Sequence, residues 1–190
     1  MIQLDDLGFV ELSEKIIVSD PGCDRGAWSL IEDLTMEPGK YKAFLVKKDK
    51  GKWGVRVSHI ICVLASEYPD IKTALERRWS KLDTICIDSG QAGVFDNSAY
   101  PNSAAKWGSF DDADSFYGEC CSITVHGGGG VMRSGKGVVV SSGYGDGIYE
   151  VKALISNGRR NAVMIDFGVS TKRHIMAALA SYQISSSNNM

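Results

Sequence analysis

Apolar and polar residues alternate along several short segments of the chain, and this period of two predicts β-strands. The clearest pair is Ile148–Ile155 and Asn161–Phe167, joined through Asn157-Gly158, a dipeptide typical of two-residue hairpin turns. A second hairpin is predicted where a short polar turn joins Lys40–Lys48 to Trp53–Ala65. The remaining expected strands are Glu14–Ser19, Asp83–Asp88, Cys120–His126 and Gly137–Ser142.

Three segments place apolar residues at helical spacing instead. They are Pro69–Leu82, Ala27–Leu34 and Thr171–Gln183, the last with Thr171 as a candidate N-cap. These elements together predict a β-rich α+β fold: a mainly antiparallel sheet, as a sandwich or partly closed barrel, with two or three peripheral helices. No linker divides the chain, so we expect one domain over residues 1–184 and a frayed polar tail over 185–190.

Composition narrows the function classes. The 190 residues carry a formal net charge of −2, so the chain gives no strong nucleic-acid signal and no sign of an anionic membrane surface. No apolar run reaches the roughly 18 residues that a transmembrane helix needs, and the N-terminus lacks the apolar region of a signal peptide. We therefore expect a soluble, cytoplasmic protein.

The five cysteines predict neither a disulfide framework nor a metal site. Their number is odd, two of them are adjacent (Cys120 and Cys121), and no C-x-x-C spacing occurs. Cys62 and Cys86 lie in apolar runs typical of core strands, where cysteine behaves as a small hydrophobic residue.

Three segments resemble known binding or catalytic motifs, but each lacks residues that the motif requires. Gly130–Gly137 has the spacing of a phosphate-binding P-loop, but Gly137 replaces the final Ser or Thr and a strand pattern follows. His126–Gly129 resembles an esterase oxyanion segment, but no G-x-S-x-G nucleophile elbow occurs in the chain. Asp111–Asp114 begins like a calcium loop, but the required Gly and Glu positions hold Tyr117 and Ile123.

Two glycine-rich segments remain as candidates for ligand binding. Asp88–Asp96 and Ser141–Gly147 each leave an apolar strand and enter a turn rich in polar groups, where glycine lets a ligand approach the backbone closely. The alternative is that both are tight loops whose carboxylates cap backbone N–H groups. The candidate residues in them are Asp88, Ser89, Gln91, Asp96, Tyr144 and Asp146.

Two further segments add candidates. Asp20-Pro21-Gly22-Cys23 has the Pro-Gly order of a type II turn at the end of a predicted strand. Asp20 and Cys23 are candidate ligand-binding residues, although neighbouring carboxylates raise a thiol pKa and disfavour a nucleophilic Cys23. Near the first hairpin, Trp53 and Arg56 offer a stacking face and a cation.

The runs SDPGC (Ser19–Cys23), DSGQAGVFD (Asp88–Asp96) and SSGYGDGIYEV (Ser141–Val151) resemble an uncharacterised family of bacterial and bacteriophage proteins. The family more often reads S-D-P-C-Y, whereas Gly22 here precedes the cysteine and Asp24 follows it. No activity is attached to the family, so the resemblance implies a phage or bacterial accessory protein without a mechanism.

Three functions follow as hypotheses. The first is a protein that binds a small polar ligand, such as a nucleotide signal, where the three polar loops converge. The second is a carboxylate- or metal-dependent hydrolase or transferase, which requires two of the candidate aspartates within roughly 4–6 Å. The third is a protein–protein interaction module with a flat apolar surface. The sequence identifies no cofactor.

Overall fold

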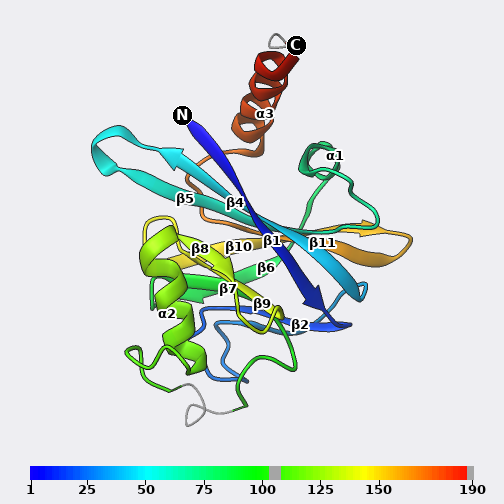
Figure 1. The fold of residues 1–190 in the computed structure, drawn as a ribbon. Helices are drawn as coiled ribbons and strands as arrows, with labels where there is room; N and C mark the ends of the chain where they lie inside the picture. The colour runs from blue at the N-terminus through cyan, green and yellow to red at the C-terminus, as the bar shows by residue number, and fades with distance from the viewer. Residues whose placement is uncertain (103–107, 188–190) are drawn as a thin grey trace.

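The computed structural model describes residues 1–102 and 108–187, and strands form most of its regular structure (Figure 1). The strands form two antiparallel sheets, one of six strands and one of five. In pairing order, the six-stranded sheet contains β1 (Ile2–Leu12), β4 (Gly39–Asp49), β5 (Val55–Leu64), β11 (Arg159–Asp166), β10 (Gly147–Ser156) and β6 (Ser80–Ile87). The five-stranded sheet contains β3 (Ile31–Thr35), β2 (Lys15–Ser19), β7 (Gln91–Asp96), β9 (Gly137–Ser141) and β8 (Gly129–Val131).

The inner faces of the two sheets pack together and enclose the largest apolar core. Leu45, Ile60 and Ile165 from the six-stranded sheet belong to one buried cluster with Val94 and Val138 from the other sheet. Because alternate residues of a strand face opposite sides, each strand supplies this core with every second side chain. The predicted β-rich α+β fold is confirmed as a sandwich of two open sheets.

Helices pack on the outer face of each sheet (Figure 1). Helices α1 (Ile71–Glu76) and α3 (Lys172–Ser187) pack on the six-stranded sheet through a second apolar cluster. Helix α2 (Phe116–Gly127) packs on the five-stranded sheet through a third. A short 3-10 helix, η1 (Gly51–Trp53), lies in the β4–β5 connection.

The predicted C-terminal hairpin is confirmed as β10 and β11. Asn157 and Gly158 have φ angles of 51° and 78°, the positive values that a type I′ turn requires at both central positions. The Asn-Gly turn and the apolar alternation in the strands therefore specify the same register. The hairpin Lys40–Lys48 and Trp53–Ala65 is likewise confirmed as β4 and β5.

Two element predictions are wrong. Ala27–Leu34 is not a helix, because its second half forms β3, whose Leu34 pairs with Ile16 of β2. Cys120–His126 is not a strand, because it belongs to α2. The Ser115 hydroxyl accepts a hydrogen bond from Gly118 N at the start of α2, and Gly128 adopts the left-handed conformation at its end. These two caps stabilise the helix and outweigh the strand preference of the β-branched residues inside it.

The predicted helix Pro69–Leu82 is shorter than its apolar spacing implies. Helix α1 ends at Glu76, and Ser80 already pairs with Ala153 of β10. Pairing with a central strand recovers more backbone hydrogen bonds than one further helical turn. The predicted turn at Asp20–Cys23 closes with a hydrogen bond from Cys23 N to Asp20 O, but Gly22 lacks the positive φ of a type II turn.

Helix α3 runs to Ser187, three residues into the predicted tail, and residues 188–190 lie outside the described part of the chain. Its start agrees with the predicted N-cap, since the Thr171 hydroxyl accepts a hydrogen bond from His174 N. None of the helices in the described residues has the length and apolar character that crossing a membrane requires.

Candidate functional site

The buried carboxylate of Asp20 joins two of the predicted ligand loops. Asp20 Oδ2 accepts hydrogen bonds from the backbone N–H groups of Asp88 and Ser89, at 2.8 and 2.7 Å. Asp20 Oδ1 accepts from the Ser89 hydroxyl at 2.6 Å and from Gly22 N at 2.7 Å. Four donors saturate this carboxylate, so its role is to hold the two loops together.

The third predicted loop adjoins the second. Ser142 N donates to Gly90 O at 2.8 Å, so the segments around Asp20, Ser89 and Ser142 are contiguous. Asp20, Cys23, Asp88 and Ser89 line a depression of about 380 Å³ together with Tyr117 of α2. The structure thus brings together four of the ten sequence-predicted residues around one hollow.

The thiol of Cys23 in this depression is poorly suited to nucleophilic chemistry. Burial raises the pKa of Cys23, and the nearby carboxylates of Asp20 and Asp88 raise it further against the opposing hydrogen bond from Ser29. Burial also raises the pKa of Tyr117. Both groups therefore stay protonated at neutral pH and act as hydrogen-bonding groups.

Gln91 and Asp96 occupy opposite ends of β7. The Gln91 side chain is buried beside α2, where its Nε2 lies 3.4 Å from Cys121 Sγ and its Oε1 has no hydrogen-bond partner in the described residues. Asp96 accepts hydrogen bonds from Ser13 N at 2.6 Å and from Ser98 N at 2.9 Å. Asp96 thus caps two backbone segments away from the depression.

The remaining predicted residues lie in neighbouring connections. Trp53 ends η1 with 58% of its side chain exposed, and Arg56 Nε donates to Trp53 O at 2.9 Å. Arg56 lines a separate hollow of about 320 Å³ beside Ser142 and Gly143. Tyr144 and Asp146 are exposed at the β9–β10 connection.

Asp20 and Asp96 do not form the close carboxylate pair that the hydrolase hypothesis requires, whereas Asp20 and Asp88 line the same depression. Asp20 is bonded to Ser89, before the first residue of β7, whereas Asp96 is the last residue of that strand. Within residues 1–102 and 108–187, no group of three or more His, Cys, Asp or Glu side chains is arranged to hold a metal ion.

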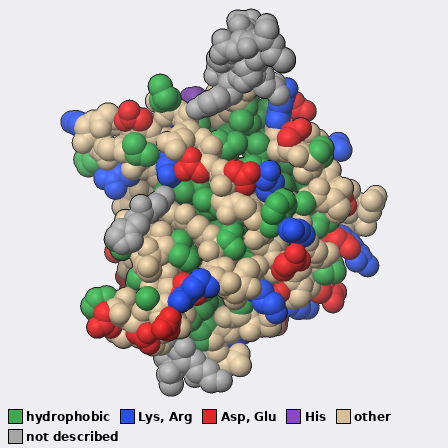
Figure 2. Space-filling model, in the orientation of Figure 1, with side chains coloured by type: hydrophobic (Ala, Val, Ile, Leu, Met, Phe, Trp, Pro, Cys, Tyr) green, Lys and Arg blue, Asp and Glu red, His purple; other side chains and the backbone are tan. Residues whose placement is uncertain are grey.

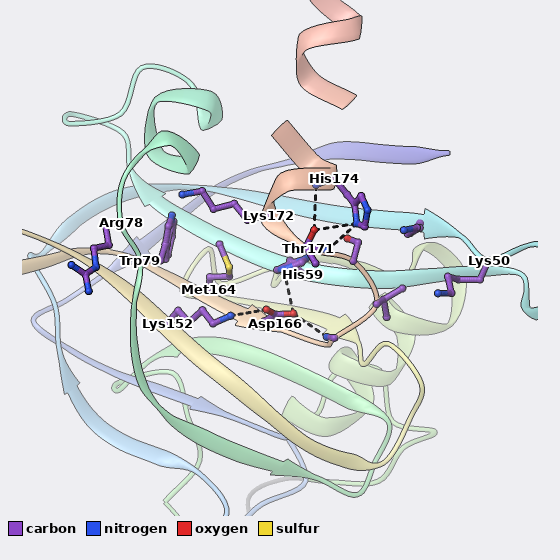
Figure 3. A pocket seen from close by; sticks show the side chains of 14 residues that line it. Lys50, His59, Arg78, Trp79, Lys152, Met164, Asp166, Thr171, Lys172 and His174 are labelled. Carbon is purple, nitrogen blue, oxygen red and sulfur yellow. Dashed lines mark hydrogen bonds and ion pairs between the residues drawn. The ribbon is translucent and has the colours of Figure 1, made fainter. Parts of the chain in front are cut away.

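A larger pocket, which sequence reasoning missed, lies on the outer face of the six-stranded sheet (Figure 3). Its volume is about 670 Å³. We call it the basic pocket, because five lysine or arginine residues and two histidines line it, and Asp166 is the carboxylate among its lining residues. The basic residues are Lys48, Lys50, Arg78, Lys152, Lys172, His59 and His174.

Strand periodicity explains why this face changes from apolar to polar. On β5, Val63 and Ile61 contribute to the apolar cluster beneath α1 and α3, and His59 is the next residue on the same face. On β11, Ala162 and Met164 are likewise followed by Asp166. The register pairs Asp166 with His59, so the two polar side chains meet next to this apolar cluster.

Asp166 organises the floor of the basic pocket (Figure 3). Its Oδ1 lies 3.3 Å from His59 Nε2 and accepts from Gly168 N at 2.9 Å, and its Oδ2 accepts from Lys152 Nζ at 2.7 Å. Burial alone would raise the pKa of Asp166, but the hydrogen bonds and charges of His59 and Lys152 hold it well below its usual range. Asp166 is therefore ionised at neutral pH.

A chain of hydroxyl groups continues from His59 to the pocket wall. Ser58 Oγ lies 2.8 Å from His59 Nδ1 and is hydrogen-bonded to Ser170 Oγ, which lines the pocket. Ser58, His59 and Asp166 are the residue types of a hydrolase triad, but Ser58 has no exposed surface. Its hydroxyl group is already hydrogen-bonded to both His59 and Ser170. This arrangement positions the Ser170 segment and does not present Ser58 as a nucleophile.

Several cations of the basic pocket lack a carboxylate partner. In the described part of the chain, Lys48, Lys50 and Arg78 form no ion pair. The Lys172 ammonium group donates to Arg77 O at 2.6 Å, and burial lowers the pKa of Lys172. Partly desolvated positive charge without a counter-charge favours an anion.

The second histidine of the basic pocket offers a hydrogen-bond donor. His174 Nδ1 lies 3.3 Å from Thr171 N, which donates to it, so the neutral ring carries its proton on Nε2. In contrast to this basic lining, acidic and basic side chains are interspersed over the face shown in Figure 2. Because the formal net charge of the chain is −2, the excess of positive charge in the basic pocket is local.

No protein-family model, curated protein or solved structure matches the chain. The resemblance to bacterial and phage proteins therefore stays a prediction. The basic pocket had one usable sequence signal: His59 and Asp166 each adjoin an apolar run of a strand. Its other cations are scattered from Lys48 to His174, and only the fold brings them together.

Proposed function

We propose that the protein binds a small phosphate-bearing anion in the basic pocket. The observation that carries the proposal is the convergence of five lysine or arginine side chains and two histidines on one pocket with a single lining carboxylate. The volume of about 670 Å³ lies within the usual range of ~300–1,000 Å³ for small-molecule sites. The proposal thus keeps the small polar ligand expected from the sequence, but makes it an anion and places it in the basic pocket instead of at the three polar loops.

Phosphate suits this lining better than a single carboxylate does. Arg78 supplies a planar fork of donors, and the lysines supply point charges elsewhere along the pocket. The hydroxyl groups of Ser170 and Thr171 add uncharged donors on the same wall. Several cations without partners call for a ligand with more than one negative charge.

The proposed site is not the loop cluster around Asp20, because four internal donors already satisfy that carboxylate. One glycine of the third loop, Gly143, also faces the protein itself. A methyl group at Gly143 would lie 2.8 Å from Phe167 Cβ and 3.1 Å from Val57 O. Glycine there permits close packing of the loop on the core.

Isothermal titration with inorganic tripolyphosphate at low salt tests the proposal. Removing the charge in Arg78→Ala or Lys50→Ala should weaken binding by about tenfold, the effect of ~1.4 kcal/mol, which is within reach of a charge-assisted hydrogen bond. Lys136→Ala is the matched control, because Lys136 is exposed between β8 and β9 of the other sheet. No binding, or equal losses in all three variants, would contradict the proposal.

A further inference from the structure

We infer that the ligand of the basic pocket is a nucleotide, with its base stacked on Trp79 and its phosphates held by the cations at the opposite end. This inference rests on the proposed anion binding and adds a chemical class to it. Its basis is the distribution of aromatic, apolar and charged groups along the pocket.

Trp79 forms a fixed aromatic wall at one end of the pocket. It lies between α1 and β6, and its indole Nε1 donates to Ala74 O at 3.1 Å. The side chain is half-buried, packs against the apolar cluster beneath α1 and α3, and also lines the pocket. The ring thus contacts the core and also borders the pocket, which is the position that a stacking residue needs.

The groups around Trp79 suit a nucleobase rather than a bare phosphate. Met164 is buried and lines the same part of the pocket, so it adds a polarisable apolar surface beside the ring. An inorganic phosphate has no group that gains from an indole ring or a thioether. A planar aromatic base gains from both, because every base has a π-face.

The opposite end of the pocket suits phosphate groups. Figure 3 shows Trp79 and Arg78 at one end and Lys50 at the other, with His174 on the side of Lys50. Lys48 and Lys50 have no ion pair among the described residues, and His174 presents a donor from Nε2. A ligand that uses both ends must join an aromatic group to several negative charges.

The experiment compares ATP and GTP with tripolyphosphate and with adenosine, by titration calorimetry in magnesium-free buffer. We expect wild type to bind the nucleotides at least about tenfold more tightly than tripolyphosphate, which is the scale of one base–aromatic stack. Adenosine, which lacks the phosphates, should bind far more weakly than ATP.

Trp79→Leu keeps an apolar side chain but removes the aromatic face. In this variant the nucleotide advantage should disappear while the affinity for tripolyphosphate stays unchanged, and Trp79→Phe should restore part of the advantage. Unchanged tripolyphosphate affinity also shows that the variant is folded. If Trp79→Leu does not fold, the inference is tested by the ratio of nucleotide to tripolyphosphate affinity in wild type and in Trp79→Phe.

The outcomes separate the two proposals. Equal affinity of wild type for nucleotides and tripolyphosphate would overturn the nucleotide inference and leave anion binding intact. A nucleotide advantage that survives in Trp79→Leu would overturn the stacking on Trp79. Binding of none of these compounds would overturn both the inference and the proposed function.

Discussion

His59 Nε2 lies 3.3 Å from Asp166 Oδ1 across the β5–β11 pair, and this contact fixes the floor of the basic pocket. Asp166 also pairs with Lys152, so one carboxylate orients two of the basic side chains. His59, Asp166 and Lys152 lie on the three neighbouring strands β5, β11 and β10. Their contacts therefore also contribute to the stability of the fold.

Asp166→Asn should lower the free energy of unfolding by about 1–3 kcal/mol at pH 7, the usual cost of removing one partner of a buried charged hydrogen bond. The pKa of Asp166 is lowered in the folded protein, so its stabilisation is present above the unfolded pKa of about 3.9. It is lost as the pH falls through the lower folded value. Urea unfolding at pH 7 and pH 3 should show a smaller difference from wild type at pH 3.

Glu150→Gln serves as the control for this measurement. Glu150 also pairs with Lys152, at 3.2 Å, but 44% of its side chain is exposed. Its substitution should change the free energy of unfolding by less than about 0.5–1 kcal/mol. A cost of Asp166→Asn that is the same at both pH values would contradict the role given to the Asp166 charge.

The same Asp166→Asn variant should bind tripolyphosphate more tightly than wild type, despite its lower stability. The substitution removes the negative charge from the pocket lining and frees the Lys152 ammonium group from its 2.7 Å contact. Calorimetric titration at low salt measures the change, and added salt should reduce it through screening. Weaker binding by the folded variant would mean that Asp166 acts on the ligand in another way.

Asp20→Ala should be among the most destabilising single changes outside the apolar core. It leaves the N–H groups of Gly22, Asp88 and Ser89 without their acceptor, and we expect a loss of at least about 3 kcal/mol. Asp88→Ala is the matched control, because this carboxylate is exposed, and it should cost less than about 0.5 kcal/mol. Thermal or urea unfolding compares the two, and equal costs would refute a structural role for Asp20.

The thiols should differ in reactivity according to burial. Burial raises the pKa of Cys62 to about 12 and also raises the pKa of Cys120, so neither should react with iodoacetamide in the native protein. Burial, with the neighbouring Asp20 and Asp88 charges, raises the pKa of Cys23, so its alkylation should be slow at pH 7 and faster above pH 9. Mass spectrometry of the labelled peptides follows each site. Rapid labelling of Cys23 at pH 7 would instead indicate an activated thiolate.

Local patterns predicted the hairpins well because the information lies in adjacent residues. Asn157 and Gly158 specify the turn of β10 and β11, and the alternation on either side specifies which face is buried. The patterns failed where a distant segment decided the structure. Ile31 and Leu34 have helical spacing, and only pairing with β2 makes residues Ile31–Thr35 a strand.

The same distinction holds for the candidate site. Proximity of Asp20 to Ser89 was expected from the convergence of polar loops, and the hydrogen bonds bear this out. The saturation of Asp20 could not be read from residue types, because it depends on where backbone N–H groups point. The basic pocket needed the full topology, since Arg78 and Lys50 line one pocket only after the strands of the six-stranded sheet are paired.

The most direct test is a crystal structure of the protein with tungstate, a heavy-atom analogue of phosphate, located by its anomalous scattering. The proposal predicts a tungstate ion inside the basic pocket, within hydrogen-bonding distance of Lys50 or His174, and its loss in Lys50→Ala crystals. Tungstate bound only at surface lysines outside the pocket, or in the depression beside Asp88, would contradict it.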